Sequence, residues 1–211
     1  MGRPRTFETN EALDSAMDVF WRKGYEGASM VELTTAMGIN SPSLYAAFGS
    51  KKGLFLAVLD HYDKDRAGFL TQVIEEPTAH DAAARFLYGI ADKATEPDAP
   101  PGCLLIQSGL TCGDDASDIP DVLAKHRAGT ELALRERFEC AKTENELPKS
   151  ADPSALARYL MALSNGICIQ ASSGVGRAQL HQIVKLALCT LPSVEKAANE
   201  NSAKKRVRRK K

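Results

Sequence analysis

Apolar side chains recur every three or four residues along most of this 211-residue chain, which is the period of an amphipathic α-helix. The first such stripe, made of Leu13, Ala16, Met17 and Phe20, predicts a helix over residues 9–23. Similar stripes predict further helices over residues 29–37, 42–48, 51–75, 78–94, 103–112, 117–141, 153–173 and 177–191. No segment shows the alternation of polar and apolar residues that a half-buried strand requires. The pattern predicts an all-α protein.

Two of the predicted helices are short and are joined by a tight turn, in the stretch SMVELTTAMGINSPSLYAAFGSKK that begins at Ser29. Ser29 and Glu32 have the spacing of a capping box, which marks a helix start. A glycine ends this first helix, and Ser41 followed by Pro42 is a second start signal. We predict that the pair forms a helix-turn-helix, whose second helix fits the major groove of DNA. The structural alternative is a helical hairpin inside an ordinary domain.

The second helix of this motif is predicted to have one apolar side and one polar side. Leu44 and Phe48 lie four residues apart and would anchor it inward, which leaves small or hydrogen-bonding groups on the other side. Ser50 then caps the next helix, whose free amides form a predicted phosphate site together with Lys51. The residues predicted to contact DNA are Arg3, Arg5, Ser29, Ser41, Pro42, Ser43, Tyr45, Ala46, Ala47, Lys51 and Lys52.

The net charge is zero, with 27 basic and 27 acidic residues, but the charges are unevenly distributed. Seven of the basic residues lie between positions 203 and 211, so the rest of the chain carries 20 basic against 27 acidic side chains. An acidic body repels DNA at long range, and DNA binding would therefore depend on local basic groups. The sequence offers three such groups, which are Arg3 with Arg5, Lys51 with Lys52, and the basic tail.

The nucleophilic and metal-ligating residues form no motif with known chemistry. Five cysteines and four histidines are scattered along the chain without CxxC or HExxH spacing, which argues against a zinc site, another metal site or a disulfide framework. There is no GxSxG stretch and no phosphate-binding glycine loop, so the sequence predicts no cofactor and no enzyme. An alternative interpretation of Cys103 or Cys112 is a redox sensor.

No segment is apolar over the ~18 residues that are needed to cross a bilayer. The N-terminus has no apolar run behind its charges, unlike a secretion signal. We therefore expect a cytoplasmic protein with no membrane partner.

Three stretches near the start of the chain resemble the DNA-binding domain of the TetR/AcrR family of bacterial transcription regulators. They are GRPR at the N-terminus, ALDSAMDVFWRKGYEGASM before the motif and MGINSPSLYAAFGSKKGLF through it. Thr34 departs from the family pattern, which usually has a small alanine at this position. The resemblance implies a basic arm that lies along DNA, contacts from Tyr45 and Lys51 to the DNA backbone, a dimer formed through the last two helices, and repression rather than activation.

The predicted elements group into four segments. Residues 1–8 form a basic arm, residues 9–66 a helix-turn-helix domain with its motif at 29–48, residues 67–195 a helical domain for ligand sensing and dimerisation, and residues 196–211 a basic disordered tail. The candidate lining of a ligand pocket is Leu87, Tyr88, Ile90, Leu105, Gln107, Leu134, Phe138 and Met161. The candidate dimer contacts are Leu156, Tyr159, Leu160, Leu163, Leu180, Ile183, Val184, Ala187 and Leu188.

These observations predict a homodimeric, sequence-specific regulator of transcription, most simply a repressor that an unidentified small-molecule effector releases from a palindromic operator in double-stranded DNA. The alternative is a DNA-compacting protein that binds any sequence through its basic tail. Deleting residues 203–211 distinguishes the two, because only the compacting protein would lose most of its DNA binding.

Overall fold

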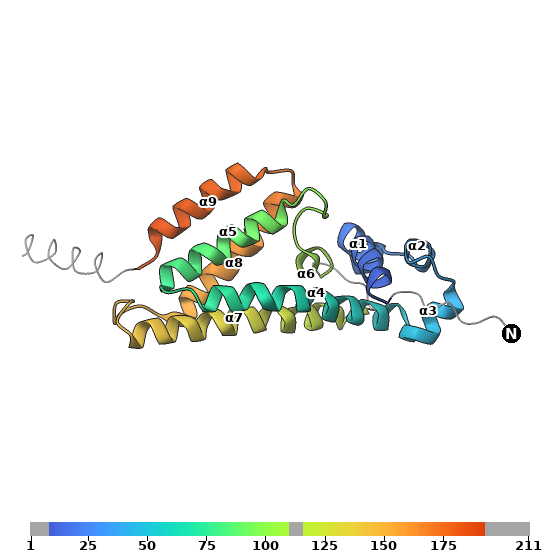
Figure 1. The fold of residues 1–211 in the computed structure, drawn as a ribbon, viewed down its shortest axis with the longest axis horizontal. Coiled ribbons are helices and arrows are strands. Elements are labelled where there is room, and N and C mark those ends of the chain that lie inside the picture. Colours follow the sequence, from blue (N-terminus) through green and yellow to red (C-terminus); the bar gives the residue numbers. More distant parts are fainter. Residues whose placement is uncertain (1–8, 110–115, 193–211) are drawn as a thin grey trace, which may run out of the picture.

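The computed structural model describes residues 9–109 and 116–192, and every regular element in these two ranges is an α-helix (Figure 1). The elements are α1 (Thr9–Gly27), α2 (Met30–Ala36), α3 (Ser41–Phe48), α4 (Lys51–Ile74), α5 (Ala79–Ala94), α6 (Leu104–Gln107), α7 (Ile119–Thr143), α8 (Pro153–Ser172) and α9 (Arg177–Thr190). The prediction of an all-α fold with a small N-terminal domain and a larger helical domain is confirmed. Within the described ranges, no helix is both long enough and apolar enough to span a membrane. Arg3, Arg5, Cys112 and the basic tail lie outside the described residues.

Helices α1, α2, α3 and the first part of α4 share one apolar core. At its centre the ring of Phe20 packs edge-on against Phe55, with ring centroids 4.9 Å apart, and Tyr25 packs against Phe55 at 5.0 Å. Leu33 of α2 and Leu44 of α3 are fully buried in the same cluster. A helix of eight residues, such as α3, is too short to be stable alone, so this burial holds α3 in place.

Helix α4 connects the small domain to the larger one. It contacts α1 and α3 on one side of the junction, and α5 and α7 on the other. Figure 1 shows α4 running alongside α7, with α2 and α3 at one end of the molecule and α9 toward the other. A single helix of 24 residues therefore joins the end of the molecule that holds α2 and α3 to the interior of the larger domain.

The larger domain is a bundle of α5, α7, α8 and α9. Helix α8 packs against both α5 and α7, and α9 packs mainly against α5. Phe86, Leu87, Leu134, Phe138 and Leu160 are buried at the centre of this bundle. The two domains thus have separate cores, which meet where α6 and α7 reach the small domain.

The structure corrects the predicted ends of α1, α3 and α6. Helix α1 runs to Gly27 instead of residue 23, with a kink at Gly24, where φ is 71°. The cap of α3 is Asn40 and not Ser41, because the Asn40 side-chain oxygen accepts the Ser43 amide hydrogen at 2.8 Å and Ser41 is already helical. Asparagine is as good an N-cap as serine, and the sequence signal fits both. Helix α6 is the four-residue segment Leu104–Gln107 instead of the predicted 103–112, since Ser108 and Gly109 form a turn.

Candidate nucleic-acid interface and adjoining cavity

The start of α2 is fixed by the predicted capping box. The Glu32 amide donates to Ser29 Oγ at 3.2 Å, and the Ser29 amide donates to Glu32 Oε2 at 3.1 Å. Lys23 of α1 forms an ion pair with the same carboxylate. Lys23 first, and the Ser29 amide and hydroxyl next, lower the pKa of the Glu32 carboxyl to about 2. The Glu32 carboxyl thus keeps its charge down to about pH 2. The stability that this charge contributes is fully present above the ordinary pKa of 4.5 and is lost as the pH falls from there through about 2.

Thr34, the residue that departs from the family pattern, fits its site. Thr34 lies on the buried side of α2, and its hydroxyl donates to the carbonyl oxygen of Met30 in the same helix at 2.9 Å. A buried hydroxyl costs free energy only when it lacks a hydrogen-bond partner. The departure from alanine therefore leaves the packing of the motif intact.

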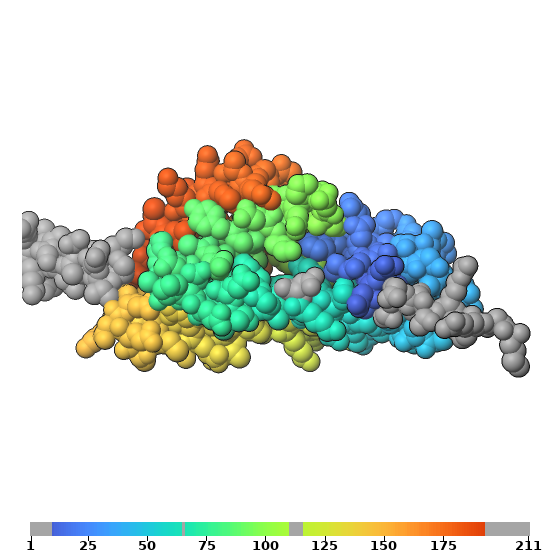
Figure 2. All heavy atoms as spheres, viewed as in Figure 1, coloured from blue at the N-terminus to red at the C-terminus, as the bar shows by residue number. Residues whose placement is uncertain are grey.

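Helix α3 presents an exposed face at the end of the molecule away from the larger domain (Figures 1 and 2). The buried Leu44 anchors its inner side. Tyr45 points outward with 51% of its surface exposed, although aromatic residues are usually covered. Ser41, Pro42, Ala46 and Ala47 are also exposed, and Ser43 is half-buried. The structure thus gathers the predicted α3 residues on one accessible surface. The sequence analysis missed Val31 of α2, which is also exposed in the motif.

The two lysines at the start of α4 have partners within the chain. Lys51 Nζ lies 4.7 Å from the centroid of the Tyr25 ring and donates to the Glu26 carbonyl oxygen at 3.3 Å. Burial lowers the pKa of Lys51, and the charge of Glu26 opposes this shift. Lys52 forms an ion pair with Asp118 at the start of α7, and this contact lowers the pKa of the Asp118 carboxyl. Lys52 therefore connects the small domain to the larger one. A DNA phosphate would have to compete with Asp118 for the Lys52 ammonium group.

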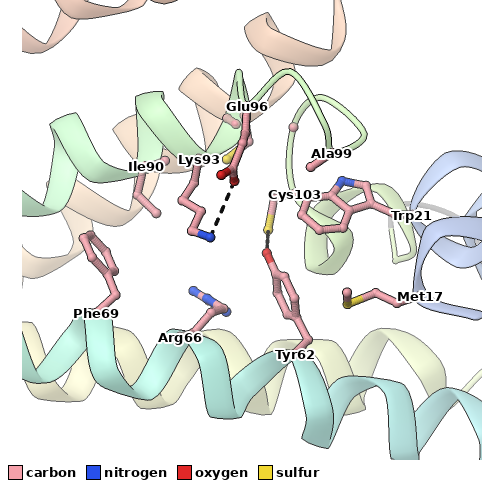
Figure 3. A pocket seen from close by; sticks show the side chains of 13 residues that line it. Met17, Trp21, Tyr62, Arg66, Phe69, Ile90, Lys93, Glu96, Ala99 and Cys103 are labelled. Carbon is pink, nitrogen blue, oxygen red and sulfur yellow. Dashed lines mark hydrogen bonds and ion pairs between the residues drawn. The ribbon is translucent and has the colours of Figure 1, made fainter. Parts of the chain in front are cut away.

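A cavity of about 190 Å³ lies where the small and larger domains meet (Figure 3). Its walls come from α1, α4, α5, the segment before α6, and α8. The lining residues are Met17, Trp21, Tyr62, Arg66, Phe69, Ile90, Lys93, Ala94, Glu96, Ala99, Gly102, Cys103 and Cys168. A second cavity of about 20 Å³ shares Arg66, Ile90, Cys103 and Cys168 with it.

The candidate pocket residues chosen from the sequence are divided among different places in the structure. Ile90 lines the larger cavity, while Leu105 and Met161 line the smaller one together with it. Tyr88 packs edge-on against His181, and Gln107 donates to the Pro101 carbonyl oxygen at 2.9 Å. The other three candidates, Leu87, Leu134 and Phe138, are core residues of the bundle. None of the residues chosen from the sequence lies on α1 or α4, although both helices contribute to the walls of the larger cavity.

The candidate dimer residues on α8 and α9 are also of two kinds. Tyr159 is exposed, and the partly buried candidates are Leu156, Leu163 and Ile183. The other five, Leu160, Leu180, Val184, Ala187 and Leu188, are buried within the chain's own bundle. The exposed apolar residues that the sequence analysis missed are Ile169 of α8, with 45% of its surface exposed, and Leu186 of α9, with 70%.

An exposed second helix in a helix-turn-helix, joined by one long helix to a larger helical domain, defines the class of helix-turn-helix transcription regulators. The model of the family described as bacterial regulatory proteins, tetR family, matches residues 12–58. The HTH-type transcriptional repressor ComR of Escherichia coli (strain K12) is 36% identical over 197 residues, which cover 92% of this chain and 94% of that protein. The chain therefore belongs to the TetR family of transcriptional regulators, which are not enzymes.

Solved structures agree with this assignment. A cysteine mutant of the TetR-family regulator CifR, in complex with 26-base-pair double-strand operator DNA, has a TM-score of 0.87 and 37% sequence identity, and the match covers 90% of this chain and 100% of that one. A putative TetR transcriptional regulator from Rhodococcus sp. RHA1 has 42% identity and a TM-score of 0.61, with 87% and 98% of the two chains covered. The resemblance of the N-terminal stretches to this family is thus confirmed across the whole fold.

Proposed function

We propose that this protein is a cytoplasmic repressor that binds a specific operator in double-stranded DNA as a homodimer and is released by a small molecule. The exposed face of α3 is the observation that carries the proposal. Its small side chains, Ser41, Ala46 and Ala47, allow close approach to base edges, and Tyr45 and Lys51 flank them as contacts to phosphate. The relatives support it, since ComR is described as a repressor and CifR was solved with operator DNA.

A dimer is proposed because one short α3 gives limited affinity and because α8 and α9 expose apolar side chains. Ile169, Leu186 and Tyr159 lie on these two helices and are exposed in the single chain. Burying such side chains against a second copy removes apolar surface from water. Two copies related by a two-fold axis would place two α3 helices about one turn of DNA apart, which requires a palindromic operator.

Replacing Leu186 by serine is expected to weaken the dimer about tenfold or more, because one apolar contact is lost from each of two copies. Sedimentation velocity over a concentration series measures the change. The matched control is Leu132→Ser on α7, a leucine that is also exposed, at 44%, but lies outside the proposed interface. Equal dimer affinities for the two variants would contradict the placement of the interface on α9.

The cavity between the domains is the proposed effector site. It touches α1 and α4 of the small domain as well as α5 and α8 of the larger one, so a ligand inside it contacts both. A ligand shifts a two-state equilibrium only by its difference in affinity for the two states. A site at this junction gives a ligand different affinities for the two states, because the shape of the cavity depends on the positions of α1 and α4 relative to α5.

Replacing Lys51 by alanine is expected to weaken binding to all DNA sequences alike, because phosphate contacts position a protein without reading bases. The slope of log affinity against log salt should fall by about 0.9 for each lysine removed, or nearly two for a dimer. The matched control is Lys64→Ala, an exposed lysine further along α4. Identical salt slopes for Lys51→Ala and the parent would remove Lys51 from the interface.

The decisive experiment for the proposed function is selection of bound DNA from a random duplex pool at near-physiological salt. Recovery of one palindrome by the full chain, and by a chain without residues 203–211, supports the operator-binding function. Recovery without sequence preference, with most binding lost when these residues are deleted, would support the DNA-compacting alternative instead. Footprinting on the recovered site then tests whether two copies bind it.

A further inference from the structure

Cys103 lies in the wall of the cavity between the two domains, immediately before α6. Its sulfur points toward the hydroxyl of Tyr62 on α4, with Sγ and Oη 3.6 Å apart (Figure 3). Cys168 of α8 lines the same cavity. Cys103 is half-buried rather than enclosed in the core, so a molecule that enters the cavity can reach its sulfur. The proposed function makes no use of this thiol.

The neighbours of Cys103 favour its ionised form. A hydrogen bond from the Cys168 thiol, the positive charge of Arg66 and the Tyr62 hydroxyl together lower the pKa of the Cys103 thiol to about 6, although burial opposes the shift. Burial raises the pKa of Tyr62, which therefore stays protonated and available as a donor. A thiolate, not a thiol, is the nucleophile in cysteine chemistry. The surroundings of Cys103 therefore favour its thiolate form.

The remaining polar groups of the cavity are largely hydrogen-bond donors. The indole Nε1–H of Trp21 is buried and has no hydrogen-bond partner among the described residues, and Trp21 itself is only 8% exposed. Arg66 contributes its guanidinium group. Lys93 forms an ion pair with Glu96 at 3.5 Å at the rim (Figure 3). A ligand that brings an acceptor oxygen would satisfy donors of this kind.

The rest of the lining and the volume limit the size and polarity of that ligand. Met17, Phe69 and Ile90 provide apolar walls from three different helices. The volume of about 190 Å³ exceeds the roughly 150 Å³ of an engineered cavity that binds benzene. A six-membered ring with one or two substituents therefore fits, whereas a large drug-like molecule does not fit this form of the cavity.

We propose that Cys103 captures a small, mainly apolar α,β-unsaturated carbonyl compound by forming a covalent bond with it. The thiolate attacks the β-carbon, and a carbon–sulfur bond forms. The π electrons of the carbon–carbon double bond move toward the carbonyl oxygen, giving an enolate that Tyr62 and Arg66 can stabilise by hydrogen bonds. Water then supplies a proton to the α-carbon, and the product is a thioether. The step needs neither an oxidant nor a leaving group.

This inference names the effector class of the proposed function, and it rests on that function only for the effect on DNA. The adduct would lie between Trp21 of α1, Tyr62 and Arg66 of α4, and Ile90 of α5. These helices belong to both domains, so a bound group of this size biases the angle between α4 and the larger bundle. Because the bond is covalent, the bias lasts as long as the adduct does.

The first test is intact-mass spectrometry of the full chain with 2-cyclohexen-1-one, after reduction and removal of the reductant. We expect one adduct per chain, mapped to Cys103, formed about tenfold or more faster than any adduct at the exposed Cys140 of α7. Cyclohexanone has the same ring without the double bond and should form no adduct. Cys103→Ser should abolish the fast labelling, and Cys140→Ser should leave it unchanged. Equal labelling of Cys103→Ser and the parent would overturn the proposal.

The second test is the pH dependence of the labelling rate, which a merely accessible cysteine would not reproduce. The rate should level off above about pH 6 to 7, where an ordinary thiol is still gaining reactivity. The charged and titratable residues that line the two cavities with Cys103 are Tyr62 and Arg66 of α4, Lys93 and Glu96 near the end of α5, Arg127 of α7 and Cys168 of α8. Arg66→Gln should move the midpoint upward by roughly one pH unit or more. A rate that keeps rising through pH 9 in the parent would exclude an activated thiol.

Operator affinity of the labelled protein separates this inference from the proposed function. Labelled protein that releases its operator supports both. Labelled protein that keeps full operator affinity rejects the enone class as the effector, while protein that binds no operator even when unlabelled rejects the proposed function and leaves the capture at Cys103 intact.

Discussion

Replacing Tyr45 by alanine is expected to lower the affinity of the dimer for its operator by about 10²–10⁴-fold. The Tyr45 side chain is half exposed on α3 and is not needed for the core. A hydrogen bond to a charged group such as phosphate contributes about 1.5–3 kcal/mol, and a dimer loses two of them. The sum of about 3–6 kcal/mol corresponds to the stated factor. Fluorescence anisotropy with the selected operator measures the loss.

Two variants control this result. Tyr45→Phe keeps the ring and removes only the hydroxyl, so it should show most of the loss if the contact is to phosphate. Tyr88→Phe makes the same chemical change on α5, where the ring packs against His181, and should leave operator affinity unchanged. Thermal unfolding should be the same for Tyr45→Phe and the parent, because no buried group is lost. Full affinity in Tyr45→Phe would show that the hydroxyl makes no DNA contact.

The helix-turn-helix could be predicted from the sequence because its signals are local. The capping box of Ser29 and Glu32 forms within four residues, and Ser50 caps α4 through the Gly53 amide as predicted. Leu44 has the helical spacing that marks an inward residue, and it is fully buried. The sequence did not determine the first residue of α3, because Asn40 and Ser41 are both good N-caps. Only the structure identifies Asn40 as the cap.

The cavity could not be predicted in the same way because its walls come from segments far apart in the chain. Periodicity shows which face of a helix is apolar, but it does not show which element that face meets. Trp21 and Tyr62 have the spacing of core residues, and their rings do pack edge-on at 5.4 Å. The same two side chains also form one wall of the cavity. That Cys103 and Cys168, 65 positions apart, lie in one cavity is likewise visible only in the folded chain.

The same limit applies to the outer faces of α8 and α9. Both helices have apolar stripes, and the sequence analysis took these stripes as the dimer contacts. In the structure Leu160, Leu180 and Val184 are fully buried in the bundle of one chain. Ile169 and Leu186 lie off the stripes and remain exposed. A helix that packs against its own domain and against a second chain needs two apolar faces. The face with more apolar residues dominates the sequence pattern, so the smaller face is not recognised from the sequence.

Replacing Gly53 by alanine is expected to destabilise the protein by about 1–3 kcal/mol and to disturb DNA binding as well. Gly53 lies in the first turn of α4, directly after the end of α3. A Cβ atom at this position would lie 1.9 Å from the carbonyl oxygen of Phe48 and 3.1 Å from its carbonyl carbon. These are backbone atoms at the last residue of α3, so no side-chain rotation relieves the clash. The joint between α3 and α4 must open, and α3 must shift with it.

Gly68→Ala in the same helix is the matched control, and it should stabilise the protein instead of destabilising it. A Cβ atom at Gly68 would meet nothing within 4 Å, and alanine is favoured over glycine inside a helix by roughly 0.5–1 kcal/mol. Since 1 kcal/mol shifts Tm by about 2–4 °C in a chain of this size, the melting temperatures of the two variants should lie on opposite sides of the parent. At temperatures where all three proteins are folded, only Gly53→Ala should bind the operator more weakly, because only this change moves α3. If Gly53→Ala has the melting temperature and operator affinity of the parent, the connection between α3 and α4 accommodates the added Cβ atom without loss of stability, and the prediction is wrong.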